Sequence, residues 1–285
     1  MKKYGVIVCS NAATDYIEAA KGIEVFRSVI IFGDKEYNDF VDMTTDEFYN
    51  RCLIDKDNFP HTAYVSRGFM LETFESMKGK GYDGAFVITI ASALSGLNNT
   101  VKLVGEEVEG FDVVVYDSKS LSYPEAKMAI TARDMFEAGA SVEEVVAKLD
   151  FIKSHNHIFF AVDTLEYLIR NGRLSRAKGA IANLLKIRPM LHIDANGKVE
   201  SLETARTSTK ARRLMALKFL EEVKGKKAEA FFVNTNNDEG ILEAKKVLEE
   251  NNYDTSNMKT YLLTPVVGAH AGPGTIGLGY IEIEE

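Results

Sequence analysis

The sequence has no tryptophan, only two cysteines and only five prolines among its 285 residues. Cys9 and Cys52 are too few for a disulfide framework, and neither lies in a spacing typical of metal ligands. No apolar run approaches the roughly 20 residues of a membrane span, and the run that follows Lys2 and Lys3 is only as long as a strand. These absences predict a cytoplasmic protein without a secretory signal.

Positive charge is also scarce. The chain has 42 acidic and 34 basic residues, which gives a net charge of -8 at pH 7. This balance argues against a general nucleic-acid-binding protein, because such affinity depends on cationic contacts to phosphate. No GxxxxGK[ST] element is present, so a nucleotide-binding P-loop is not supported, and we expect no cofactor on this chain.

Apolar strands alternate with helical segments in the first half of the chain. The run at 84–90 is almost continuously apolar, as expected inside a parallel sheet. The alternation predicts an α/β domain with a mainly parallel sheet over residues 1–160. Strands are predicted at 5–9, 25–32, 84–90 and 113–116, and helices at 46–53 (with Thr44 or Thr45 as N-cap), 69–78, 101–109, 124–138 and 142–154.

The second half has a different pattern, with a strong hairpin turn at 194–197 between two short strands. It predicts a second α/β domain over residues 161–285, with a mixed or largely antiparallel sheet. Strands are predicted at 158–162, 190–193, 199–204, 228–234, 261–263 and the C-terminus, and helical segments at 165–169, 209–223 and 238–251.

Three hydroxyl-rich loops of the first half follow or precede predicted elements: 62–66, 90–98 and 117–120. In α/β sheets, ligands bind beyond the carboxyl ends of the strands, where helix N-termini attract anions. Thr62, Ser92 and Ser95 therefore predict a small anion site. The alternative is that these hydroxyls only cap helices, as Ser95 could do.

Near the C-terminus, His270 is the one histidine in a glycine-rich segment, 267–275. Glycine allows close approach of the backbone to a ligand, and imidazole suits proton transfer near neutral pH. We therefore expect a loop that aims His270 at a ligand. The alternative is a glycine-rich hairpin with an incidental histidine.

Positive charge concentrates in two segments of the second half. No acidic residue occurs from Tyr167 to Ile193, and a second basic stretch runs from 205 to 220 and includes Arg206. Such a stretch is either a solvated face or a docking surface for an acidic protein or a phosphate donor. The basic residues of the first segment are Arg170, Arg173, Arg176, Lys178, Lys186 and Arg188.

In their order and spacing, these segments resemble the DegV family, whose members bind fatty acids and act as substrate subunits of bacterial fatty acid kinase. The resemblance covers essentially the whole chain. Three segments depart from the family pattern, at Cys9-Ser10, at 63–65 and at Leu97. The matching segments are Thr62…Ser66, 92–96, 117–120, 165–168, 171–175, 185–189, 206–207 and 268–275.

The resemblance implies two α/β domains with a long-chain acyl group between them. It implies that Arg170 or Arg173, together with Arg206, faces a kinase subunit and phosphate, with His270 and Arg206 in catalytic roles. ATP and metal would then belong to the kinase, and the pathway would be phospholipid metabolism. We also expect transient membrane contact and a monomer in isolation. The implied carboxylate ligands are Thr62, Ser66, Ser92, Ser95 and His270.

Two other functions remain open from the sequence. A plain lipid carrier or storage protein would share the pocket but leave the basic segments unexplained. A serine hydrolase could combine a serine with His270 and Asp117, although the chain has no GxSxG nucleophile elbow. Formation of acyl phosphate with a kinase would separate these three functions.

Overall fold

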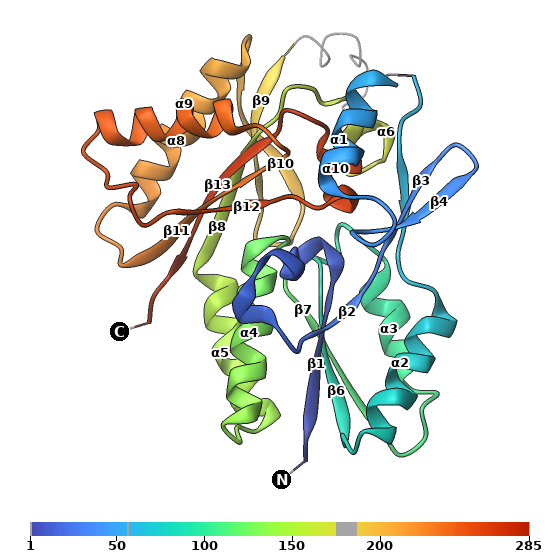
Figure 1. Cartoon of the computed structure of the whole chain (residues 1–285). Coiled ribbons are helices and arrows are strands. Elements are labelled where there is room, and N and C mark those ends of the chain that lie inside the picture. Colours follow the sequence, from blue (N-terminus) through green and yellow to red (C-terminus); the bar gives the residue numbers. More distant parts are fainter. Residues whose placement is uncertain (1, 56, 175–186, 285) are drawn as a thin grey trace. The chain divides into compact units, whose positions relative to one another are not determined.

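The computed structural model describes residues 2–55, 57–174 and 187–284, and the chain forms two compact units (Figure 1). The predicted α/β class, with a parallel sheet in one unit and a mixed sheet in the other, is confirmed. The first unit comprises Met1–Val29, Thr62–Ser154 and Ala195–Gly197. The second comprises Ile30–His61, His155–Asp194 and Lys198–Glu285.

The first unit is built on a four-stranded parallel sheet in the order β2-β1-β6-β7. Its strands are β1 (Tyr4–Cys9), β2 (Glu24–Phe26), β6 (Gly84–Thr89) and β7 (Asp112–Asp117). Every residue of β6 is buried, which explains its continuous apolar sequence. Because all four strands are parallel, their carboxyl ends lie at one edge of the sheet.

Helices pack on both faces of this sheet (Figure 1). On one face lie α2 (Arg67–Gly79) and α3 (Leu97–Gly105), which enclose a core that includes Phe74. On the other lie α4 (Tyr123–Glu137) and α5 (Val142–Ser154). The helix predicted at 101–109 begins four residues earlier, at Leu97.

The second unit contains a six-stranded sheet in the order β10-β9-β8-β13-β11-β12. All neighbours are antiparallel except β11 and β12, which are parallel. The predicted hairpin joins β9 and β10, and the last strand, β13, is an interior strand of the sheet. The strands are β8 (Asn156–Ala161), β9 (Arg188–Ile193), β10 (Val199–Ala205), β11 (Ala228–Asn234), β12 (Lys259–Leu262) and β13 (Ile276–Glu282).

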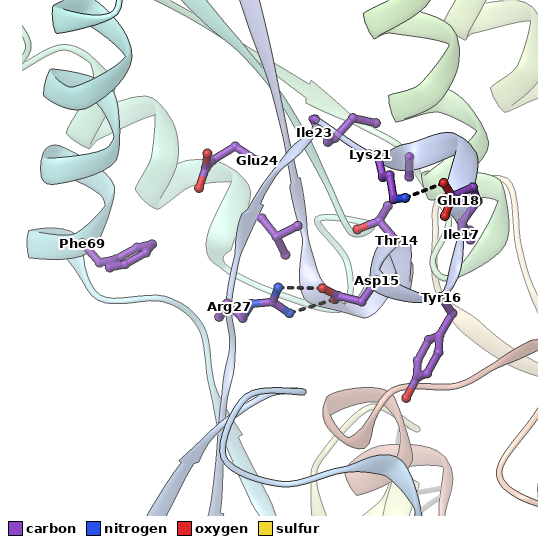
Figure 2. Close-up of a pocket in the computed structure, with 13 residues that line it drawn as sticks. Thr14, Asp15, Tyr16, Ile17, Glu18, Lys21, Ile23, Glu24, Arg27 and Phe69 are labelled. Carbon is purple, nitrogen blue, oxygen red and sulfur yellow. Dashed lines mark hydrogen bonds and ion pairs between the residues drawn. The ribbon is translucent and has the colours of Figure 1, made fainter.

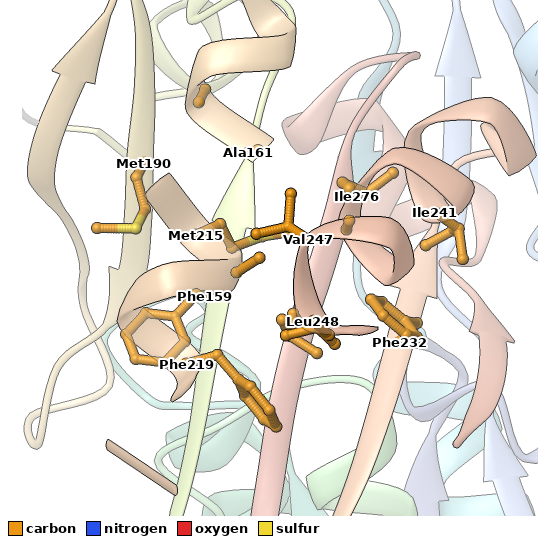
Figure 3. Packing of buried hydrophobic residues seen from close by; sticks show 14 of the residues in the cluster. Phe159, Ala161, Met190, Met215, Phe219, Phe232, Ile241, Val247, Leu248 and Ile276 are labelled. Atoms are coloured by element: carbon orange, nitrogen blue, oxygen red, sulfur yellow. The ribbon is translucent and has the colours of Figure 1, made fainter. Parts of the chain in front are cut away.

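Two long helices, α8 (Ser208–Val223) and α9 (Asp238–Glu250), pack against one face of this sheet. Their apolar side chains meet those of the strands in one buried cluster (Figure 3). Phe159, Phe219 and Phe232 are fully buried there, so this cluster is the main core of the second unit. Thr207 caps α8, since its hydroxyl accepts a hydrogen bond from the N–H of Lys210 at 3.3 Å.

Residues 30–61 belong to the second unit although they precede most of the first in sequence. They form β3 (Val29–Phe32), β4 (Lys35–Asn38) and α1 (Thr45–Ile54), and β5 (His61–Ala63) completes a small sheet in the order β4-β3-β5. The N-cap of α1 is Thr44, which forms a capping box with Glu47: each side chain accepts a hydrogen bond from the backbone N–H of the other residue. Of the two N-caps predicted from the sequence, Thr44 and Thr45, the structure therefore has Thr44.

The predicted boundary between residues 160 and 161 falls inside β8, and the second unit resumes at His155. A single boundary there does not separate the 30–61 segment from the first unit. In the described parts of the chain, no helix is both long and apolar enough to cross a membrane.

Candidate functional site

Two loops at the carboxyl edge of the first unit's sheet are joined by one carboxylate. The backbone N–H groups of Ser92 and Lys119 both donate to Oδ1 of Asp117, at 3.1 Å each. Burial alone would raise the pKa of Asp117, but hydrogen bonds from Ser92 and Lys119 outweigh it and lower that pKa. The loops after β6 and β7 are therefore held together by an ionised side chain.

The third hydroxyl-rich segment, 62–66, reaches the same region of the first unit. The hydroxyl of Tyr64 lies 3.0 Å from that of Thr100 in α3, within hydrogen-bond distance. The ring of Tyr64 also lies beside Gly96, at the start of that helix. The structure thus brings all three predicted loops to one edge of the parallel sheet.

The four candidate hydroxyls in these loops have different surroundings. Ser66 caps α2, because its Oγ accepts from the N–H of Phe69 at 3.2 Å, and Oγ of Ser95 accepts from the N–H of Leu97 at 3.3 Å. Ser92 is exposed and Thr62 is half-buried. A hydroxyl that accepts an N–H keeps its own O–H to donate, so a structural role for Ser66 or Ser95 does not prevent anion binding.

In the second unit, His270 lies in a helix and not in the predicted glycine-rich loop. α10 (Pro265–Ala271) begins with proline at its first position, where the missing N–H costs nothing, and His270 is in its last turn. The loop is confined to the residues that follow. Gly272 and Gly274 have φ of 77° and 82°, and a Cβ at either would collide with Tyr167 or Asp163, so glycine is required at both positions.

Burial and neighbouring positive charge keep His270 neutral. The residue retains some exposed surface, but its Nδ1 atom is buried. Burial first, then the charges of Arg173 and His61, lower the pKa of His270 to about 3. At neutral pH the free protein therefore presents an uncharged imidazole here, beside a guanidinium group.

Asn171 joins three segments of the second unit that are far apart in sequence. Its Nδ2 donates to the carbonyl oxygens of Pro60, at 3.2 Å, and of Ala269, at 2.8 Å. Its Oδ1 lies 3.0 Å from Nδ1 of His61. Its backbone oxygen accepts from the guanidinium of Arg173 at 2.6 Å. One residue thus holds the two histidine-bearing segments and the arginine together.

The three arginines assigned to phosphate or partner contacts are not equivalent. Arg170, at the end of α6 (Glu166–Arg170), is exposed, pairs with Glu166 at 2.8 Å and stacks on the ring of Phe59 at 4.1 Å. Arg173 is half-buried, and burial lowers its pKa. Arg206 is exposed just after β10. Three further basic residues of the first segment, Arg176, Lys178 and Lys186, lie outside the described residues.

Gly268 lets α10 pack closely on α1. A Cβ at this position would lie 2.5 Å from the hydroxyl of Tyr49 and 2.7 Å from the ring of Phe48, both of which are buried. We expect Gly268→Ala to lower the free energy of unfolding by about 1–3 kcal/mol, through overpacking. Chemical denaturation measures the change.

Gly68→Ala is the matched control, because a Cβ at that position in α2 meets nothing within 4 Å. It should be neutral or stabilise the protein by up to about 1 kcal/mol, since alanine is the better helix former. Equal effects of the two substitutions would contradict the assigned packing.

A separate cavity of 570 Å³ lies in the first unit, between the short helical turns after β1, β2 and α2 (Figure 2). Charged pairs line it. Arg27 faces Asp15 with two hydrogen bonds of 2.8 and 2.7 Å, and Lys21 pairs with Glu18. None of the predicted carboxylate ligands is among its lining residues, and its charged wall differs from the apolar wall that an acyl chain needs.

Three polar residues near these loops and helices were not singled out from the sequence. Asn171 lies in 171–175, one of the segments that carry the family resemblance, but no role was predicted for it. His61 directly precedes Thr62, and no role was predicted for it either. Glu125 is fully buried in the first unit, where it accepts from the side chain of Asn11 at 2.5 Å, and burial raises its pKa well above the usual range.

Across the described residues, no group of three or more His, Cys, Asp or Glu side chains could hold a metal ion.

Comparison with known proteins places this fold in a family. A family model described as "Uncharacterised protein, DegV family" matches residues 3–283. A DegV domain-containing protein of Halalkalibacterium halodurans is 30% identical over 287 residues, covering 99% of this chain and all of the relative.

Two solved structures have the same fold over nearly the whole chain. The structure of DegV from Bacillus subtilis, described as a fatty acid binding protein, has a TM-score of 0.83 and 27% identity, and covers 99% of this chain and 100% of its own. A stearic acid-binding protein from Eubacterium ventriosum has a TM-score of 0.82 and 26% identity, covering 98% of both chains. The chain belongs to the DegV family.

Proposed function

We propose that this protein binds one long-chain fatty acid and presents its carboxylate to a separate ATP-dependent kinase, which forms an acyl phosphate. The observation that carries the fatty acid part is the match, over nearly the full chain, to proteins described as fatty acid binding and stearic acid binding. The kinase part rests on the resemblance of the motifs. ATP and metal would be supplied by the kinase, and the product would enter phospholipid metabolism.

The hydroxyl-rich loops support the choice of a carboxylate as the bound group. Thr62, Ser92 and Ser95 are the proposed ligands in the first unit, with Ser66 as a further donor near the start of α2. An ionised acceptor makes these hydrogen bonds stronger than neutral ones. Asp117 holds the Ser92 loop in place beside these hydroxyls, through the backbone N–H of Ser92 and through the Ser92 side chain.

The polar groups of the second unit support a transfer step. A neutral His270 can hydrogen-bond a carboxylate, and Arg173 offers a guanidinium whose charge is poorly solvated. Arginine stabilises charge that develops on a transferring phosphoryl group. Arg206 and Arg170 are exposed, which suits contacts with the kinase.

Purified protein is expected to carry one long-chain fatty acid per chain after expression in lipid-replete cells. Native mass spectrometry, followed by mass spectrometry of the released lipid, measures the stoichiometry and identifies the acid. Ligand-free protein in every preparation, with no uptake of added stearate, would contradict the proposed function.

Removing the hydroxyls should weaken binding without unfolding the protein. We expect Thr62→Ala, or Ser92→Ala combined with Ser95→Ala, to cost about 1.5–3 kcal/mol of binding free energy, the usual value of a charge-assisted hydrogen bond. Isothermal titration with a soluble fatty acid measures the affinity, and thermal melting measures the stability.

Ser141→Ala is the control for helix capping in the same unit. Oγ of Ser141 accepts from the N–H of Glu144 at 3.2 Å, at the start of α5. Its loss should cost about 1 kcal/mol of stability and leave fatty acid affinity unchanged. If the Ser92 and Ser95 variants behave like Ser141→Ala, these hydroxyls serve only as caps.

A further inference from the structure

The N-terminus of α10 is not capped by the residue in its own N-cap position. That residue is Thr264, but among the described residues its side chain makes no capping hydrogen bond and its buried hydroxyl has no partner. Pro265, the first helical residue, has no N–H to satisfy. The first N–H that needs an acceptor is therefore that of Val266, the second residue of the helix.

Asp39 supplies this acceptor from 227 residues earlier in the chain. Its Oδ1 accepts from the N–H of Val266 at 3.3 Å, which is the bond that an N-cap side chain makes with the second helical residue. Asp39 is fully buried, so water does not compete for this bond. The next residue, Phe40, has φ of 62°, which is rare for a bulky side chain, so the loop is sharply bent where Asp39 reaches α10.

Other contacts from the same segment hold the entry and the middle of α10. The hydroxyl of Tyr49 donates to the carbonyl oxygen of Leu263, just before the helix, at 2.9 Å. Gly268 packs against Tyr49 and Phe48. Asp39 differs from these contacts because it binds a backbone group inside the first turn of the helix.

His270 lies one turn beyond the residue that Asp39 caps. Residues four apart lie one above the other on the same side of an α-helix, so Val266 and His270 share one side of α10. The helix has seven residues, so its first and last turns are adjacent. A displacement at Val266 is passed on to the imidazole, because a helix this short has no further turn to absorb it.

We propose that Asp39 is a positioning residue, which caps α10 from a distant segment and so fixes the place of the His270 imidazole. Its importance for the ligand rests on the proposed function, in which His270 hydrogen-bonds the fatty acid carboxylate. Asp39 contacts no ligand in this proposal. Its oxygen serves as a hydrogen-bond acceptor, and the amide oxygen of an asparagine can replace it.

The first experiment needs no ligand and uses NMR spectra of the free protein. In Asp39→Ala, the N–H of Val266 should exchange with solvent about tenfold faster, since it loses its acceptor. The pKa of His270, about 3 in the wild type, should rise towards the ordinary 6.5 as water reaches the displaced ring. Asp39→Asn keeps an acceptor and should match the wild type in both measurements.

Thr207→Ala is the matched control, because Thr207 accepts from the N–H of Lys210 at the same 3.3 Å, at the start of α8 in the same unit. It should destabilise the protein to a similar extent and leave the pKa of His270 unchanged. If Asp39→Ala does not fold, Asp39→Ser replaces it, since the shorter side chain withdraws the acceptor and stays polar. An unchanged pKa of His270 in the variant that folds, or an equal change in Thr207→Ala, would overturn the positioning role.

The second experiment is a double-mutant cycle measured by titration calorimetry with decanoate, a soluble fatty acid anion. Asp39→Ala should weaken binding about tenfold, as expected when a hydrogen bond to a charged group is lost, and Asp39→Asn should restore the affinity. In a His270→Ala background, Asp39→Ala should change the affinity by less than about twofold, because effects that act through one residue do not add.

The outcomes separate this inference from the proposed function. If Asp39→Ala weakens binding by the same factor in both backgrounds, Asp39 acts independently of His270 and the inference is overturned. Wild-type protein that binds no decanoate and carries no fatty acid would refute the proposed function. The exchange of the Val266 N–H and the pKa of His270 in the free protein would still confirm or refute the positioning role.

Discussion

Arg173→Ala is expected to reduce acyl phosphate formation about a thousandfold at saturating kinase, in the range found when an arginine that stabilises phosphoryl transfer is removed. The physical reason is that Arg173 is half-buried and held by the backbone oxygen of Asn171, so that its charge is poorly screened by water. The measurement is turnover of the purified pair with ATP. Fatty acid content should stay near one per chain.

Two comparisons make this result specific. Arg206 is exposed, so Arg206→Ala should act mainly at low kinase concentration, and raised salt should mimic its effect. Lys246→Ala removes one exposed charge from α9, outside the basic segments, and should change nothing. An Arg173→Ala protein that loses its lipid but is phosphorylated at the normal rate would refute the assignment.

Acid is expected to destabilise the second unit through His270. The ordinary pKa of 6.5 applies to the unfolded chain, whereas the folded protein lowers it to about 3. Between these values the unfolded state binds a proton that the folded state does not, so stability is lost as pH falls through 6.5 towards 3. At about pH 5 the loss amounts to about 2 kcal/mol, at 1.36 kcal/mol per pKa unit.

The test compares the free energy of unfolding of the wild type and His270→Gln at about pH 7 and about pH 5. The variant should lose about 2 kcal/mol less on acidification, since glutamine has no proton to gain. His192 also has a pKa lowered by burial and by His157, and it contributes equally to both proteins. Identical pH dependence would show that His270 is not the group responsible.

The elements that the sequence predicted well are those with strong local signals. β6 is an uninterrupted apolar run, and α5 has the predicted bounds, 142 to 154, because amphipathic spacing and an acidic first turn mark it. The family and its α/β class follow from motifs whose order and spacing were visible in the chain. The roles of Thr62, Ser92 and Ser95 remain predictions.

α10 was missed because its stabilisation is not local. Three glycines and two prolines in and just after the segment are typical of a loop, but Gly268 allows the helix to approach Tyr49 and Phe48. The contacts that form this helix come from α6 and from α1, and α1 lies more than 200 residues earlier in the chain. Nothing in the periodicity of 265–271 could have indicated it.

The role of Asn171 was missed for the same reason. Its hydrogen bond to His61 joins residues 110 positions apart, and Asn171 is an ordinary polar residue by composition. Residues 30–61 likewise belong to the second unit because of contacts made in the folded chain, which no local sequence pattern indicates. An asparagine directly before a glycine with φ of 71°, Gly172, was the only local sign that the backbone there is specialised.

The position of β13 has a consequence for how this protein is made. Residues 276–282 pair with both β8 and β11, so the centre of the six-stranded sheet is filled by the part of the unit that leaves the ribosome last. Until then, β8 and β11 expose unpaired backbone groups that attract other chains. The first unit, apart from a turn of three residues, is synthesised by Ser154 and can mature early. Chaperone contact during translation should therefore concentrate on the nascent second unit and end only when the final strand emerges.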